Sequence, residues 1–176
     1  MLLTKSSEEL YAQYTDRMQK IADVKYSAAV LQWDQETYLP AKGADFRGRQ
    51  IATLSEIAHE WFTDDSLGQL LQDLCERNDL RADQQRNITL SLEDYEKQKK
   101  FTPAFIRRLS EASSRCFHSW LQARAANSFA LFKDDLQQMV QLKKEEADLA
   151  GYEKHPYNAL LDQYEKGATV ALLDRV

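Results

Sequence analysis

Apolar residues recur every three or four positions along most of this chain, which is the spacing of one face of an α-helix. Ser6 and Glu9 precede the first such series in the arrangement of a capping box, which marks a helix N-terminus. Pro40 predicts the end of this long element, because the residue before a proline avoids helical angles. The apolar positions are Leu10, Tyr14, Met18, Ile21, Val24, Ala28 and Leu31.

Three further helices are predicted between residues 44 and 100. The second covers about 44–62, and the break at 63–66 is rich in N-cap residues. A shorter leucine-rich helix follows and ends near Asn78, and a fourth covers about 82–100. The expected inner faces are Ile51, Leu54, Ala58 and Trp61, then Leu67, Leu70, Leu71 and Leu74, then Ile88, Leu92 and Tyr95.

Thr102 and Pro103 predict the start of a fifth helix, since threonine can cap and proline fits the first turn. A sixth helix is expected to end at Gly151, a residue type that often follows a helix. A short helix over 157–164 and another that begins after the N-cap Thr169 complete the pattern. Expected inner residues are Phe105, Leu109, Ala112, Cys116, Trp120 and Ala123 in the fifth helix, and Phe132, Leu136, Ala147 and either Met139 or Val140 in the sixth.

This succession predicts an all-α fold of long antiparallel helices, with residues 1–176 as a single helical domain. The sequence has 176 residues, of which 43% are hydrophobic and 29% are charged. A globular chain of this length can bury a sizeable core. Only seven residues follow Thr169, and so short a helix is marginal by itself. We therefore expect the domain to be incomplete at its C-terminal end.

The net charge of -5 argues against a nucleic-acid partner, which usually requires a basic face. The sequence has no run of 18 apolar residues, so we expect no membrane-spanning helix. Cys75 and Cys116 lie far apart and belong to no paired motif, and the first residues do not form a signal peptide. A reducing, cytoplasmic compartment is the resulting expectation.

The segment 31–54 is more particular than the rest of the chain. Its distinctive residues are Trp33, Asp34, Thr37, Leu39, Pro40, Gly43, Arg47 and Gln50. Together with the stretch Tyr157–Glu165, this pattern resembles the carboxypeptidase Taq family of zinc metallocarboxypeptidases. The resemblance implies the N-terminal helical portion of a larger helical enzyme. That enzyme would release single amino acids from peptide C-termini.

In that family, zinc is held by two histidines of an H-E-x-x-H helix and a later glutamate, and the glutamate of the motif is the general base. This sequence contains no H-E-x-x-H, so no catalytic or metal-binding residue is assigned to it, and its substrate-binding residues stay unknown. The resemblance implies zinc in the complete enzyme only, a C-terminal catalytic portion as partner, a peptide substrate and a homodimer. By itself the chain is expected to be inactive. The alternative is a free-standing helical interaction module.

Two partial metal motifs share one histidine. His59 and Glu60 begin like the zinc helix, but Thr63 stands where the second histidine is required. A catalytic zinc needs about three protein ligands. Glu56 and His59 form the E-x-x-H unit of di-iron bundles, yet neither of the other two histidines has a glutamate three positions earlier. An ordinary helical histidine is the preferred interpretation.

Trp33 and Asp34 have two interpretations. They could form part of the wall or lid of a substrate cleft. Alternatively, Trp33 fills the core while Asp34 caps a helix or pairs with Arg47 or Arg49. The structural interpretation is favoured, because a charged residue beside a large aromatic one usually supports packing.

Two other groups also allow a functional and a structural interpretation. His155, Pro156 and Tyr157 resemble a His-Pro-aromatic motif of the family, but their position favours a simple helix start. A local basic cluster could attract a peptide carboxylate. Acidic residues at 93–96 lie nearby in the sequence, so a solvated helix junction is favoured. The cluster comprises Lys97, Lys99, Lys100, Arg107 and Arg108.

Overall fold

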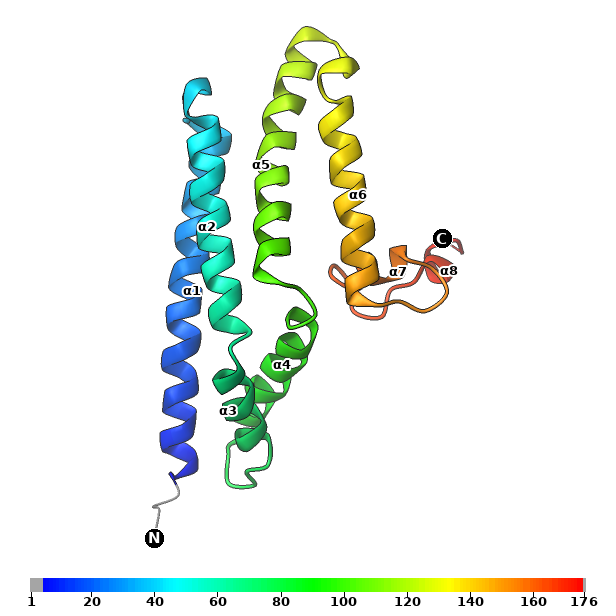
Figure 1. Ribbon diagram of the computed structural model, residues 1–176. Coiled ribbons are helices and arrows are strands. Elements are labelled where there is room, and N and C mark those ends of the chain that lie inside the picture. The colour runs from blue at the N-terminus through cyan, green and yellow to red at the C-terminus, as the bar shows by residue number, and fades with distance from the viewer. Residues whose placement is uncertain (1–4, 176) are drawn as a thin grey trace. The chain divides into compact units, whose positions relative to one another are not determined.

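The computed structural model describes residues 5–175, and this part of the chain is helical and contains no strand (Figure 1). The prediction of an all-α fold is therefore confirmed. The α-helices are α1 (Ser7–Thr37), α2 (Ala44–Phe62), α3 (Asp65–Cys75), α4 (Ala82–Gln98), α5 (Pro103–Ala126), α6 (Lys133–Ala150), α7 (Tyr157–Leu161) and α8 (Val170–Leu173). Two 3-10 turns, η1 (Ala41–Gly43) and η2 (Phe129–Leu131), lie before α2 and α6 and were not expected.

The helix ends follow the local chemistry of the sequence. At the start of α1, Glu9 N donates to Ser6 Oγ at 3.2 Å, and Ser6 N donates to the Glu9 carboxylate at 2.8 Å, which completes the predicted capping box. Phe105 N donates to Thr102 Oγ1 at 3.2 Å at the start of α5. At the end of α6, Gly151 adopts a φ of +76°, a conformation that favours glycine.

The helix predicted over 157–164 is shorter than expected, because α7 ends at Leu161. A turn follows in which Gly167 N donates to Asp162 Oδ1 at 2.9 Å. Gly167 has a φ of +84°, which favours glycine and is incompatible with a continued helix. Thr169 then caps α8 as predicted, since Leu172 N donates to its hydroxyl at 3.2 Å.

The chain divides into two compact units. The first contains the chain up to Leu39 and Gln50–Arg107. In this unit α1 runs antiparallel to α2, and the Lys25 ammonium lies 5.0 Å from the centre of the Phe62 ring. The core of the unit confirms the inner faces predicted for α3 and α4. Its buried residues are Leu10, Tyr14, Ile21, Phe62, Leu67, Leu70, Leu71, Leu74, Ile88 and Tyr95.

Polar contacts also connect α1 to α4 within the first unit. Tyr14 Oη and Ser91 Oγ are 2.8 Å apart, and Asn87 Nδ2 donates to Tyr11 Oη at 3.1 Å. The residue numbers of both partners increase together, so α1 and α4 run in parallel. Tyr14, which is buried, and Tyr11, which is half-buried, thus pack their rings against the core while their hydroxyls find polar partners.

The second unit contains Pro40–Arg49 and the chain from Arg108 onward. In it α5 and α6 are antiparallel (Figure 1), and Arg115 Nη2 donates to Gln138 Oε1 at 3.1 Å. The Cys116 thiol donates to Asp135 O at 3.1 Å, and both cysteines are free. Of the two candidates on α6, Val140 is exposed and Met139 is half-buried. The buried apolar residues are Ala112, Ala123, Leu142, Ala147 and Ala168.

Two tryptophans predicted on inner faces lie near the surface. The exposed fractions of Trp61 and Trp120 are 46% and 38%, so their assignment to the core was wrong. On α2, the buried aromatic residue is Phe62 instead. Phe62 follows Ala58 by four positions and stays on the buried face, whereas Trp61 lies at the edge of that face.

Gly68 allows α3 and α4 to approach each other closely. A Cβ atom at this position would lie 2.3 Å from Tyr95 Oη, far inside contact distance. The Tyr95 ring is buried, and its hydroxyl accepts a hydrogen bond from Lys99 Nζ at 2.9 Å. Because the ring is buried and its hydroxyl is hydrogen-bonded, it has little freedom to move away from an added methyl group.

We predict that Gly68→Ala lowers the free energy of unfolding. Overpacking costs about 1–3 kcal/mol, and the better helix propensity of alanine recovers at most about 1 kcal/mol. In a Tyr95→Leu background, the same substitution should become neutral or stabilising, because the clash has been removed. Urea unfolding of the parent, the two single variants and the double variant measures this double-mutant cycle. An equal cost in both backgrounds would show that Tyr95 is not the cause.

Candidate functional site at the junction of α2 and α3

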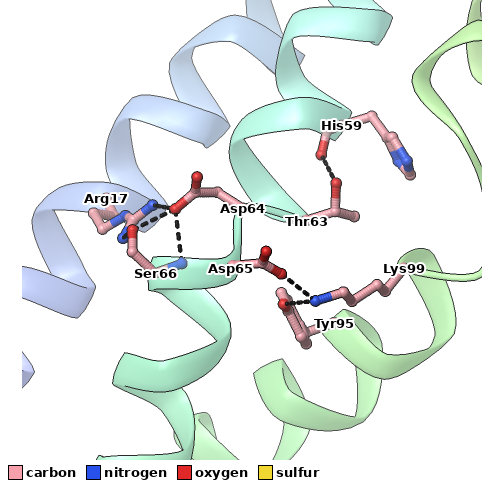
Figure 2. Close-up of polar contacts among 8 residues, drawn as sticks. All are labelled: Arg17, His59, Thr63, Asp64, Asp65, Ser66, Tyr95 and Lys99. Atoms are coloured by element: carbon pink, nitrogen blue, oxygen red, sulfur yellow. Dashed lines mark hydrogen bonds and ion pairs between the residues drawn. The ribbon is translucent and has the colours of Figure 1, made fainter.

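A polar network surrounds the end of α2, where the sequence resembles half of a zinc motif (Figure 2). Asp64 is the N-cap of α3 and accepts from Ser66 N at 3.0 Å. The Ser66 hydroxyl also donates to this carboxylate. Arg17 of α1 reaches both residues, with 2.8 Å from Nη2 to Asp64 and 2.8 Å from Nη1 to Ser66 Oγ. The network thus fastens α1 to the start of α3.

The charge of Asp64 is stabilised by these contacts. Hydrogen bonds from the Ser66 hydroxyl and then from Arg17 lower the pKa of the Asp64 carboxyl to about 2. The side chains of both ion-pair partners remain partly open to solvent, so water screens much of their attraction. The network therefore contributes modestly to the stability of the fold, and this contribution depends on the protonation of Asp64.

A second ion pair joins α3 to the end of α4. Lys99 Nζ contacts Asp65 and also donates to Tyr95 Oη (Figure 2). Asp65 and then Tyr95 raise the pKa of the Lys99 ammonium above its ordinary value. The ammonium therefore ties Asp65 to the ring that packs against Gly68.

Three cations of the predicted basic cluster have acidic partners on other helices. Lys99 pairs with Asp65, Arg107 pairs with Glu56 at 2.8 Å, and Arg108 pairs with Glu145. For these three, the charges that balance them come from α3, α2 and α6 and not from the neighbouring stretch 93–96. The sequence could not indicate these partners, because they become neighbours only in the folded chain.

His59 is a buried residue of α2 with a structural hydrogen bond. Its Nε2 lies 2.9 Å from Phe101 O, and because a carbonyl oxygen only accepts, Nε2 carries the proton. Thr63, which stands in place of the second zinc histidine, donates its hydroxyl to His59 O at 2.8 Å. This geometry agrees with the interpretation of His59 as an ordinary helical histidine. Within residues 5–175 no group of three or more His, Cys, Asp or Glu side chains is arranged to hold a metal.

A shallow groove of about 390 Å³ lies beside this network in the first unit. Its charged side chains carry both signs, so it can accommodate polar groups without a strong preference for one charge. The lining residues are Arg17, Lys20, Ile21, Glu60, Trp61 and Asp64. The absence of catalytic and metal-binding residues from this chain stays a prediction.

The other candidate residues lie elsewhere. Trp33 is largely exposed at the end of α1, with its ring centre 5.4 Å from that of Tyr38 in an edge-on contact. The interpretation that Trp33 fills the core was therefore wrong for the described chain, and its role in a cleft stays a prediction. His155 Nδ1 accepts from Tyr157 N at 3.1 Å at the start of α7, which confirms the simple helix start.

The sequence reasoning missed Tyr26 and Val30, which are apolar and exposed on the same helix as Trp33. Their spacing of four and three positions was the available signal. It was overlooked because each helix was given a single inner face.

Among the described residues, none of the helices is long and apolar enough to cross a membrane.

The fold is that of a helical segment of a larger metallopeptidase. The sequence pattern of the carboxypeptidase Taq (M32) metallopeptidase family matches residues 13–176. This chain therefore belongs to that family, as the signature around Trp33 predicted.

Known relatives agree with this assignment. The chain is 31% identical over 165 residues to Carboxypeptidase 1 of Bacillus subtilis (strain 168), and this match covers 93% of the chain and 33% of the relative. It is 29% identical over 159 residues to Thermostable carboxypeptidase 1 of Pyrococcus furiosus, covering 90% and 32%. The chain thus spans about a third of the length of these relatives.

Solved structures share the fold. The structure described as "BsuCP Crystal Structure" has a TM-score of 0.91 at 30% sequence identity, and the match covers 95% of this chain and 34% of that one. "The Structure of CHT" has a TM-score of 0.74 at 56% identity with the same coverage. In each case, the matched helices form only part of a larger protein.

We predict that Asp64→Asn reduces stability at pH 6 and that the difference shrinks on acidification. Because the folded-state pKa of Asp64 is lowered from 3.8 to about 2, its contribution is complete above the unfolded pKa and is lost as the pH falls through the folded pKa. Solvent screening limits the effect to about 1 kcal/mol or less. Urea unfolding between pH 6 and pH 2 measures it.

Asp16→Asn is the matched control for this experiment. Asp16 forms an exposed i,i+4 pair with Lys20 on α1, and such pairs contribute little. If the difference between the parent and Asp64→Asn stayed constant across this pH range, the stabilised charge of Asp64 would not be the source.

We predict that His59→Leu lowers the free energy of unfolding by about 1–3 kcal/mol, because Phe101 O loses its buried donor. Thr63→Val should cost much less, since that hydroxyl bonds within its own helix. Zinc or a chelator should leave the thermal midpoint of the parent unchanged, because a ligand stabilises only a state that binds it. A midpoint that zinc raises in the parent but not in His59→Leu would establish a metal role.

Proposed function

We propose that this chain is the N-terminal helical portion of a metal-dependent carboxypeptidase that releases single amino acids from peptide C-termini. The portion forms one wall of the substrate cleft and supports the part of the enzyme that carries the metal. By itself, the chain does not hydrolyse peptides. The observation that carries the proposal is the family match over residues 13–176, combined with coverage of only about a third of the relatives.

The polar network at the junction of α2 and α3 supports a scaffolding role. Its charges are engaged in fastening helices to one another, as in the pairs Arg17–Asp64 and Lys99–Asp65. The buried histidine likewise connects α2 to Phe101. Side chains used in this way hold helices in register, whereas a general base must be free to reach a substrate.

The metal and the assembly follow from the same proposal. Zinc would be bound by the remaining part of the enzyme, where an H-E-x-x-H helix would supply two imidazoles and a general base. The complete protein would bind peptides and form a homodimer. A cytoplasmic location stays a prediction from the unpaired cysteines.

The first test is an assay of this chain alone. We expect no release of C-terminal amino acids from N-blocked peptides and a zinc content far below one per chain, with Carboxypeptidase 1 of Bacillus subtilis as the positive control. Release of amino acids by the purified chain, with stoichiometric zinc, would contradict the proposal.

The second test asks whether the chain can act as a portion of an enzyme. Replacing the aligned third of the Bacillus subtilis protein with this chain should preserve measurable carboxypeptidase activity, because the TM-score of 0.91 indicates a closely matching backbone. The remaining two thirds of the Bacillus protein alone should be inactive. A folded but inactive hybrid would count against a shared role.

A further inference from the structure

The second half of α1 is apolar on two opposite faces. One face points into the first unit and includes Val24, Ala28 and Leu31, which are half-buried. The other face contains Tyr26, Val30 and Trp33, with exposed fractions of 71%, 63% and 57%. At 100° per residue these three side chains form a single stripe nearly opposite the buried face. We refer to Tyr26, Val30 and Trp33 as the outer stripe.

The first half of the same helix has an ordinary water-facing side. Its exposed positions are mostly charged or amide residues, in contrast to the outer stripe. A helix with one apolar face is typical of a protein surface, whereas a helix that is apolar all round is typical of an interior. The exposed residues of this first half are Glu8, Glu9, Ala12, Gln13, Asp16, Gln19 and Lys20.

A groove of about 220 Å³ lies between α1 and α2. Small side chains such as Ala28, Ala29 and Ala58 leave this space open, and Ile51 and Leu54 provide apolar walls. A protruding apolar side chain of a neighbouring segment fits such a groove. The second half of α1 therefore carries the outer stripe and, through Ala28 and Ala29, also lines this groove.

We propose that the outer stripe is the docking surface for the remaining polypeptide of the full-length metallocarboxypeptidase. This inference rests on the proposed function. The length of the relatives selects this occupant: the aligned portion covers about 95% of this chain but only 34% of the Bacillus structure that it matches at a TM-score of 0.91. The same helices are thus accompanied by twice their own length of further chain. A helix apolar on both sides is then packed on both sides.

Binding of a complementary segment tests this surface. The two thirds of the 56%-identical relative that lie outside the aligned portion are purified and mixed with this chain. Light scattering after size exclusion should show a 1:1 complex. The triple variant Tyr26→Gln, Val30→Gln and Trp33→Gln should weaken the Kd about a hundredfold, because buried aromatic and aliphatic anchors carry most of the energy of an interface.

A matched pair of single variants localises the effect. Trp33→Gln should weaken the Kd about tenfold, whereas Leu90→Gln, at an exposed apolar position of α4, should change it less than about threefold. Glutamine is a good helix former, so the fold is expected to persist, and the far-UV circular dichroism and thermal midpoint verify this. Equal losses for the two variants would overturn the assignment to α1.

Trp33 itself provides a measurement that does not depend on disrupting the stripe. The sequence has three tryptophans, so Trp61→Phe with Trp120→Phe leaves Trp33 as the only one. Its fluorescence should shift to shorter wavelength when the complementary segment binds and excludes water. An unchanged emission in a complex that does form would overturn the inference.

The remaining outcomes separate this inference from the proposed function. A complex that the triple variant forms undiminished would overturn the docking surface and leave the proposed function standing. If the chain self-associates, and the triple variant abolishes only this self-association, the occupant is a second copy and the inference is overturned. If the unaltered chain forms no complex with the segment, the docking surface is overturned, and the proposed function is then judged by the activity of the hybrid enzyme.

Discussion

The close approach of α3 and α4 at Gly68 is the contact on which the first unit depends. With no side chain on Gly68, the ring of Tyr95 lies directly against the helix backbone and fills the core. That position brings the Tyr95 hydroxyl to Lys99, and Lys99 to Asp65. The contact of the Tyr95 ring with the backbone of α3 thus determines where Lys99, at the end of α4, finds its partner.

Beyond the Lys99–Asp65 pair, further polar residues connect the helices at the junction of α2 and α3. The start of α3 is fixed by Asp64, which Arg17 connects to α1, and the end of α2 is connected by His59 to Phe101. The residues drawn in Figure 2 include a histidine, two aspartates, a lysine and an arginine, which are residue types common in catalytic clusters. These side chains serve a structural purpose instead, because their hydrogen bonds join helices to one another and leave no reactive group available.

Membership of the M32 metallopeptidase family gives this scaffold its context. The chain spans about a third of the length of its relatives, and the proposed docking of further polypeptide would cover its exposed apolar stripe. The sequence placed Trp33 in the core because a charged residue beside a large aromatic one usually supports packing, and that expectation does not allow for a second apolar face on the helix. Large exposed apolar residues are informative when they form a pattern, and the stripe Tyr26, Val30 and Trp33 has a regular helical spacing.

The sequence by itself determined the helices and their ends, because caps, prolines and apolar spacing act over a few neighbouring residues. The Ser6–Glu9 capping box, the N-cap Thr102 and the inner faces of α3 and α4 could all be predicted in this way. Only the tertiary structure decided that Phe62 replaces Trp61 in the core and that Arg17 meets Asp64. Those outcomes depend on the rotation and approach of whole helices, which are set by contacts between residues far apart in the chain.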